Sequence, residues 1–272
     1  MPNSVVLNSI LTSPSMRWRL SFWTTMVSLA IQLVLGGVLY VQLYRTTDEV
    51  LTGGLAGRGQ MVAAGCEKIL FFPLYPHYAG ATSATANDQF FRALMKEKRQ
   101  PAIRTAPEYF GTPLYIDALA QSVEQAYAAL DHRPDVLVAS YHGMPKRYLM
   151  EGDPYHCQCQ KTTRLLRERL GWDKGAIDTT FQSVFGPEEW LKPYTVEHVA
   201  ELARAGKRKI AVISPAFAAD CIETLEEIQG EIREAFLHAG GESFTYIPCL
   251  NDDDAHIAAL MEVTAQNLAG WV

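Results

Sequence analysis

The 272-residue sequence has few cysteines, no excess of basic charge and only one long apolar run. Five cysteines in a chain of this length do not form a disulfide scaffold, so they indicate a reducing compartment or a metal centre. The formal net charge is −6, and no long basic run is present. Nucleic acid is therefore excluded as an expected partner. Internal repeats and low-complexity stretches are also absent.

The single long apolar run lies near the N-terminus, from Phe22 to Val41, and contains no charged residue. A run of this length can cross the hydrocarbon core of a bilayer. Trp18 and Tyr44 are among the aromatic residues that flank it, as in an interfacial belt. We expect a transmembrane helix over 22–41, with a buried helix or a cleaved signal peptide as the alternatives. The Gly-rich stretch from Leu51 to Gly59 is expected to be a linker.

From about Gly65 onwards, short apolar runs alternate with longer segments of helical spacing. The runs are rich in Val, Ile and Phe and predict strands buried on both faces at 68–72, 135–140, 209–214 and 244–247. Helices are predicted around 83–98, 114–130, 155–170, 195–205, 221–239 and 253–268. This alternation predicts an α/β fold with parallel sheets covered by helices. Ligands bind beyond the carboxyl ends of the strands in such sheets.

His142 follows one of the predicted strands and is flanked by Tyr141 and Gly143. A histidine there can take up a proton near neutral pH or bind a metal ion as neutral imidazole. Gly143 would allow backbone or ligand to approach closely. The simpler interpretation is a loop histidine bonded to the backbone, and the residues alone favour it.

Glu223, Glu227 and Glu231 are spaced i, i+4, i+8 on the predicted helix 221–239 and should lie along one face. We expect them to point into a cleft and to form a polar track for cations or protons. A solvated acidic face is the alternative. The opposite face should carry a buried apolar stripe, made of Leu225, Ile228, Ile232 and Phe236.

Two further groups of residues could take part in ligand or metal binding. Phe185 and Trp190 lie in a Gly/Pro-containing block and could cap a flat apolar ligand, although aromatic side chains more often fill a core. Four cysteines could hold an iron–sulfur centre, but their spacing matches no strong cluster or zinc motif, and free thiols are favoured: Cys157, Cys159, Cys221 and Cys249.

Taken together, these segments resemble the ferrochelatase family, which inserts ferrous iron into protoporphyrin IX to give haem. The resemblance runs from about residue 64 to the C-terminus, is closest to the proteobacterial members, and is carried by PLYPHYAGATSAT (73–85), VLVASYHGMPKRYLMEGDPY (136–155), FQSVFGPEEWLKP (181–193), ISPAFAADCIETLEEI (213–228) and YIPCLND (246–252). Residues 1–57 instead resemble the membrane anchor of a histidine kinase.

The resemblance implies a lyase with two similar parallel-sheet domains that hold the porphyrin between them. His142 and Glu223 would be the catalytic pair, and both would handle metal together with Glu227 and Glu231. The residues that would line or support the porphyrin pocket are Tyr75, Gln182, Trp190, Phe217 and Asp220. Ferrous iron is a substrate, and no cofactor is expected. Gly80 occupies the position of the cysteine upstream in the iron–sulfur-containing members, so the resemblance gives no support for a cluster.

The resemblance also implies a domain organisation and a location. Residues 64–131 would be the remnant of an N-terminal chelatase domain, and residues 132–272 the C-terminal domain with its closing helix. The family implies a cytoplasmic protein, to which residues 22–41 would add a single-pass membrane attachment. Because the first strand and loops of the family pattern are replaced, we expect slow or absent iron insertion. A membrane-tethered remnant that binds tetrapyrrole or metal without turnover is the alternative function.

Overall fold

The computed structural model describes residues 65–271, whose strands form two parallel β-sheets. The smaller sheet is formed by β1 (Lys68–Phe71) and β2 (Ala102–Thr105). The larger sheet has the order β4-β3-β5-β6, with bounds β3 Val136–His142, β4 Ile177–Gln182, β5 Lys209–Ile213 and β6 Ser243–Tyr246. The helices are η1 Gly80–Ala84, α3 Thr85–Leu94, α4 Pro113–Ala128, α5 Lys146–Met150, α6 Tyr155–Arg169, α7 Thr195–Arg204, η2 Glu223–Ile232, α8 Arg233–His238 and α9 Asp254–Leu268.

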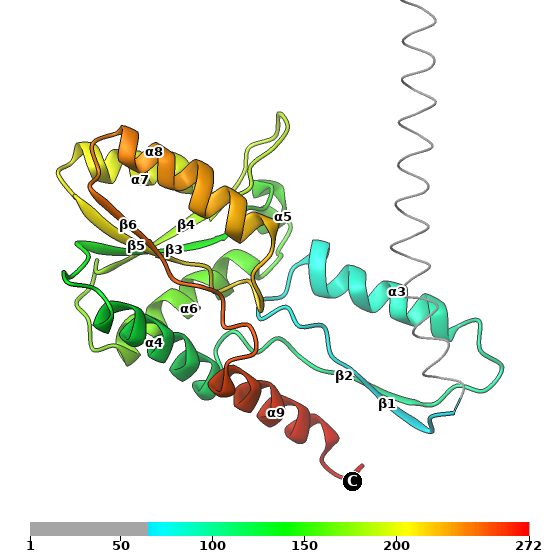
Figure 1. Cartoon of the computed structure of the whole chain (residues 1–272). Helices are drawn as coiled ribbons and strands as arrows, with labels where there is room; N and C mark the ends of the chain where they lie inside the picture. Colours follow the sequence, from blue (N-terminus) through cyan, green and yellow to red (C-terminus); the bar gives the residue numbers. More distant parts are fainter. Residues whose placement is uncertain (1–64, 272) are drawn as a thin grey trace, which may run out of the picture. The chain divides into compact units, whose positions relative to one another are not determined.

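Successive residues of a strand point to opposite sides of the sheet, and helices bury both faces of this four-stranded sheet. Leu137, Ala139 and Tyr141 of β3 belong to one core cluster together with residues of α4, α6 and α9. Val136 and Val138 belong to a second cluster with α7, η2 and α8. Figure 1 shows α4 and α6 on one side of the sheet and α7 and α8 on the other. A strand covered on both faces explains the continuous apolar run in β3.

The chain changes direction across this sheet, and the change creates a crevice. It leaves β3 through α6 on one face, whereas it leaves β5 through η2 and α8 on the other face. Since β3 and β5 are adjacent, their carboxyl-end loops diverge to opposite sides of the sheet. In doubly wound sheets, ligands bind at such a topological switch point. The fold therefore places the candidate site between the loops that follow His142 and Ile213.

The two-stranded sheet is covered by α3 and attached to the end of α9. Ile69 packs with Phe90 and Leu94 in a small core cluster. Arg104 of β2 donates hydrogen bonds to the carbonyl oxygens of Asn267 (2.7 Å) and Ala269 (2.9 Å). These bonds satisfy backbone acceptors at the C-terminal end of α9, which have no partner within the helix.

The predicted parallel α/β arrangement is confirmed, and each predicted strand and helix overlaps an observed one. Two strands were missed, β2 and β4. β4 carries Asp178, Thr179 and Thr180, and β2 is a four-residue strand that contains Arg104 and Thr105, so neither has a continuous apolar run. The predicted boundary between residues 131 and 132 stays a prediction.

The expected membrane span at 22–41 and the expected linker at Leu51–Gly59 lie outside the described residues. Between residues 65 and 271, every helix is too short or too polar to cross a bilayer.

Candidate active site

His142 is the last residue of β3 and pairs in register with Gln182, the last residue of β4. Gly143 follows, and its backbone N–H donates to the Gln182 carbonyl oxygen at 2.7 Å. A Cβ atom at position 143 would lie 2.4 Å from that oxygen and 3.1 Å from the Trp190 ring. Only glycine fits here, so the close approach inferred from the sequence is made by the protein's own backbone and the Trp190 ring.

The imidazole of His142 is held on one side by the backbone of the next residue, Gly143. Its Nδ1 lies 2.7 Å from the Gly143 carbonyl oxygen, which can only accept a hydrogen bond. Nδ1 therefore carries the proton in the neutral ring, and Nε2 carries the lone pair. The hydroxyl of Tyr155 donates to the His142 carbonyl oxygen at 3.0 Å and fixes the end of the strand. His142 is half-buried, and its backbone contact agrees with the simpler interpretation without excluding proton transfer at Nε2.

A pocket of about 420 Å³ opens beside His142. Trp190 is buried within its wall, whereas Phe185 is 71% exposed although its ring centroid lies only 4.7 Å from that of Trp190. The expectation of core burial is thus confirmed for Trp190 and wrong for Phe185, because the 183–189 loop extends away from the sheet into solvent. The pocket is lined by Ala81, His142, Gly143, Met144, Pro145, Arg147, Tyr148, Phe185, Gly186, Pro187, Glu188 and Trp190.

Glu223, at the start of η2, is half-buried and interacts electrostatically with His142. A hydrogen bond from the Cys221 thiol, supported by the backbone N–H of Glu223 and by the nearby positive charge that His142 can carry, lowers the pKa of the Glu223 carboxyl. The loops after β3 and β5 therefore bring this pair to one end of one sheet. The carboxylate stays ionised to lower pH than an ordinary glutamate, which suits it to attract a cation.

Gln182 is buried between the strand ends and η2. Its side-chain oxygen accepts a hydrogen bond from Ser140 Oγ at 2.7 Å, and its Nε2 donates to the Glu223 carbonyl oxygen at 2.8 Å. The same nitrogen lies 3.2 Å from Glu227 Oε2. With its amide used in this way, Gln182 supports the site rather than facing the pocket.

Asp220 organises the loop that leads into η2. Burial alone would raise the pKa of its carboxyl, but hydrogen bonds from Asn251 and Tyr246, the Cys249 backbone N–H and Thr224 together hold this pKa below its usual value. The Asn251 amide lies 2.8 Å away and the Tyr246 hydroxyl 2.5 Å away. Asp220 is therefore a structural anchor for the loop and for the first turn of η2, which carries Glu223.

The acidic row is only partly directed toward the sheet. Glu223 and Glu227 are half-buried at the strand ends, but Glu231 is exposed, so the expectation that the whole row faces a cleft is wrong for Glu231. Eight residues, about two helical turns, separate Glu231 from Glu223, so Glu231 lies away from the turn of η2 that meets the strand ends. Leu225 is 49% exposed and does not join the predicted apolar stripe, whereas Ile228, Ile232 and Phe236 are buried. Because η2 has π-helical turns, residues three apart no longer share a face.

The other predicted site residues occupy different environments. The Phe217 ring centroid lies 6.2 Å from that of His142, so Phe217 is part of the site region. Tyr75 is 45% exposed and lies outside the residues that line the pocket. Cys157 and Cys159 are on α6, while Cys221 precedes η2 and Cys249 follows β6. Among residues 65–271, no cluster of three His, Cys, Asp or Glu side chains is arranged to hold a metal ion.

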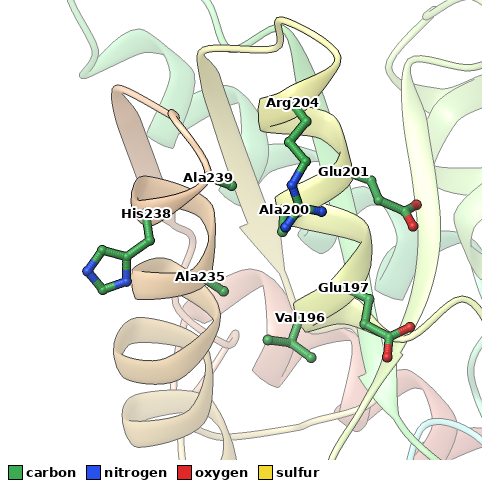
Figure 2. A pocket seen from close by; sticks show the side chains of 8 residues that line it. All are labelled: Val196, Glu197, Ala200, Glu201, Arg204, Ala235, His238 and Ala239. Atoms are coloured by element: carbon green, nitrogen blue, oxygen red, sulfur yellow. The ribbon is translucent and has the colours of Figure 1, made fainter.

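A second and larger pocket, of about 630 Å³, lies between α7 and α8. Figure 2 shows small side chains on its floor, including Ala200 and Ala235, while Glu197 and His238 point away from one another. We call this surface the α7–α8 groove. It has volume but lacks convergent polar groups, which mark a binding site.

Comparison with known proteins assigns a family to most of the chain. Residues 57–268 match the family model described as Ferrochelatase. The Ferrochelatase of Rhodobacter capsulatus is 80% identical over 212 residues, which cover 78% of this chain and 60% of that protein. Those of Allorhizobium ampelinum and Rhizobium meliloti are 60% and 57% identical over 209 residues, covering 77% of this chain and 61% and 62% of the relatives. The chain thus spans about three fifths of the length of these relatives.

Proposed function

The chain belongs to the ferrochelatase family, and from this premise we propose that it inserts ferrous iron into a porphyrin at the site formed by His142 and Glu223. The observation that supports the proposal is the position of these two residues in the fold. His142 ends β3 and Glu223 begins η2 after the adjacent β5, so both follow the carboxyl ends of neighbouring parallel strands, and His142 lines an apolar pocket.

Porphyrin metallation must remove two pyrrole protons and deliver a divalent cation to the ring nitrogens. His142 Nε2 is a suitable proton acceptor, because imidazole works as a general base near neutral pH. The Glu223 carboxylate has a lowered pKa and a hard oxygen donor, which suits it to hold Fe²⁺ as the substrate ion. We therefore assign proton removal to His142 and cation handling to Glu223.

The pocket provides the apolar surface that a flat macrocycle requires. Trp190 and Phe185 would contact the ring, and Gly143 keeps the Trp190 ring close to the strand end. A rigid wall can hold the ring in a bent shape that exposes its nitrogen lone pairs. Tyr75 and Phe217 would add further contacts to the ring, whereas Gln182 and Asp220 would support the site by holding the first turn of η2.

Glu231 and Glu227 extend the acidic row from solvent toward Glu223. Ferrous iron approaching the site would meet the exposed Glu231 first, because an anionic row raises the local concentration of cations. In this proposal Glu231 and Glu223 handle the substrate ion, and the row is not a resident metal site.

The test is anaerobic metallation of protoporphyrin IX by the full chain, with the Rhodobacter capsulatus relative in parallel. We expect His142→Ala to lower kcat/KM at least about 100-fold, the lower range for loss of a general base. The matched control is His238→Ala, in the α7–α8 groove, which should retain the full rate. The ratio of the metallation rate of this chain to that of the relative measures how much slower this chain inserts iron.

Two outcomes would contradict the proposal. A His142→Ala rate within about threefold of the unaltered chain would remove His142 from the chemistry. Porphyrin binding without any iron insertion would assign the chain to the alternative function, a tetrapyrrole-binding protein without turnover.

A further inference from the structure

Glu227, the middle member of the acidic row, has both carboxylate oxygens engaged by the protein. Oε1 accepts a hydrogen bond from the Ser183 backbone N–H at 2.5 Å. Oε2 accepts one from Ser183 Oγ at 2.5 Å and one from Gln182 Nε2 at 3.2 Å. Hydrogen bonds to an ionised acceptor are the strong ones, so releasing this carboxylate costs several such bonds.

Ser183 occupies a backbone conformation that it does not favour by itself. Its φ is +59°, in the left-handed region where residues other than glycine carry a steric penalty. The two hydrogen bonds to Glu227 come from the backbone N–H and the hydroxyl of this one residue. The hydrogen bonds to the Glu227 carboxylate thus offset the steric penalty of the Ser183 backbone conformation, at the point where the chain leaves β4.

This turn connects two parts of the candidate site. The loop that starts at Ser183 carries Phe185 and Trp190 of the pocket wall. On the other side, Gln182 holds the Glu223 carbonyl oxygen in the first turn of η2, and its own amide is oriented by the buried Ser140 hydroxyl. The hydrogen bonds around Glu227 therefore join the aromatic wall to the helix turn that carries the Glu223 carboxylate.

We propose that Glu227 is a positioning residue, which locks the Ser183 turn to η2 and fixes the pocket wall relative to Glu223, rather than a ligand that passes iron along the acidic row. The proposal rests on the proposed function for the identity of the reaction. Glu231, the next carboxylate of the row, is exposed.

The first test is hydrogen exchange of the backbone amides in the full chain. We expect Glu227→Gln to speed exchange in residues 183–190 and in the first turns of η2 by about tenfold or more, because charge-assisted bonds are lost. Ser183→Ala removes only the hydroxyl and should accelerate the same amides to a smaller extent. The double variant should fall short of the sum of the two effects, as expected for partners in one contact. Glu226→Gln, an exposed neighbour on the same helix, is the matched control and should change nothing.

The second test separates positioning from metal transfer. Binding of Co²⁺, used as a stand-in for Fe²⁺, should be the same in Glu227→Gln and Glu226→Gln within about twofold. In turnover, Glu227→Gln and Ser183→Ala should both lower kcat while the KM for Fe²⁺ stays unchanged, because the wall is displaced and cation capture is retained.

Unchanged exchange in Glu227→Gln would overturn the proposal. So would a selective rise in the KM for Fe²⁺, or weaker Co²⁺ binding, in Glu227→Gln when Ser183→Ala shows neither. If the unaltered chain inserts no iron, the proposed function fails, but the exchange measurement still decides whether Glu227 positions the turn.

Discussion

Two pockets among the described residues differ in volume and in organisation, and the smaller of this pair has the features of an active site. The α7–α8 groove is the larger, at about 630 Å³ against about 420 Å³, but Glu197 and His238 point away from one another and small residues form its floor. The His142 pocket lies at a topological switch point, next to strand ends where the buried Gln182 bonds to the Ser140 hydroxyl and to the Glu223 carbonyl oxygen. Orientation of polar groups, more than volume, therefore distinguishes the two surfaces.

The difference originates in the connections of the sheet. The groove lies between two helices on the same face, where nothing requires backbone polar groups to converge. At the carboxyl ends of β3, β4 and β5, three strands stop together, and their last residues must satisfy their polar groups with one another. Substitutions at the strand ends should therefore have large effects on the metallation rate and on the free energy of unfolding, and substitutions in the groove should have small effects on both.

The largest effect after loss of His142 is expected for Glu223. Glu223→Gln keeps the size of the side chain but removes the charge that interacts with His142 and attracts the cation. We expect metallation to fall by about 100-fold, roughly 3 kcal/mol in activation free energy. Glu197→Gln, in the groove, is the control. Steady-state rates at saturating porphyrin measure both, and equal rates for the two variants would remove the distinction between the surfaces.

The second prediction concerns the buried Gln182. Gln182→Leu leaves the Glu223 carbonyl oxygen without its 2.8 Å donor and deletes the acceptor of Ser140. We expect the free energy of unfolding to fall by about 2 kcal/mol, the usual range when buried partners lose a hydrogen bond. Gln229→Leu, at an exposed position of η2, should change it by less than about 0.5 kcal/mol. Urea unfolding followed by circular dichroism gives both numbers, and a similar loss in the two variants would contradict the account.

The third prediction concerns the buried His77 and the pH dependence of stability. His77 is buried against Tyr141 and Tyr155, and burial lowers its pKa from 6.5 to about 3. Below pH 6.5 the unfolded chain takes up a proton at His77 that the folded chain cannot, so stability is lost as the pH falls from about 6.5 toward 3. Between pH 7 and pH 5 this loss should be about 2 kcal/mol.

His77→Asn should flatten this dependence, whereas His238→Asn, in the groove, should leave it as in the unaltered chain. Urea unfolding at a series of pH values gives the slopes. If the free energy of unfolding depends on pH in the same way in all three proteins, the folded chain can bind a proton at His77 and the prediction is wrong.

The smallest effect is expected in the groove itself. Arg204→Gln alters one of its charged side chains without touching the sheet ends. We expect metallation and the free energy of unfolding to change by no more than about 0.5 kcal/mol. A larger loss of metallation would show that the groove contributes to activity.

The sequence predicted the architecture because the relevant signal is local. Apolar runs such as 209–214 and helical spacing such as 155–170 reflect burial within one element, and the structure confirms both. The edge strand β4 was missed because its polar residues Asp178, Thr179 and Thr180 interrupt the apolar run.

The site could be predicted only in part, because its organisation depends on partners distant in the sequence. His142 and Glu223 were named from their motifs, but the hydrogen bonds of Glu227 to Ser183 depend on how η2 meets the end of β4. The exposure of Leu225 follows from π-helical turns, which the spacing of apolar residues does not reveal. A positive φ at Ser183 likewise has no signature in a residue other than glycine.

The most direct test of the central claim is a hydrogen-exchange footprint of protoporphyrin IX on the full chain. The claim is that the strand ends around His142, and not the larger α7–α8 groove, bind the porphyrin. We predict that saturating porphyrin slows exchange in residues 142–150 and 183–190 and leaves residues 196–204 and 235–239 unchanged. Protection of the groove residues, with the His142 segment unaffected, would contradict the account.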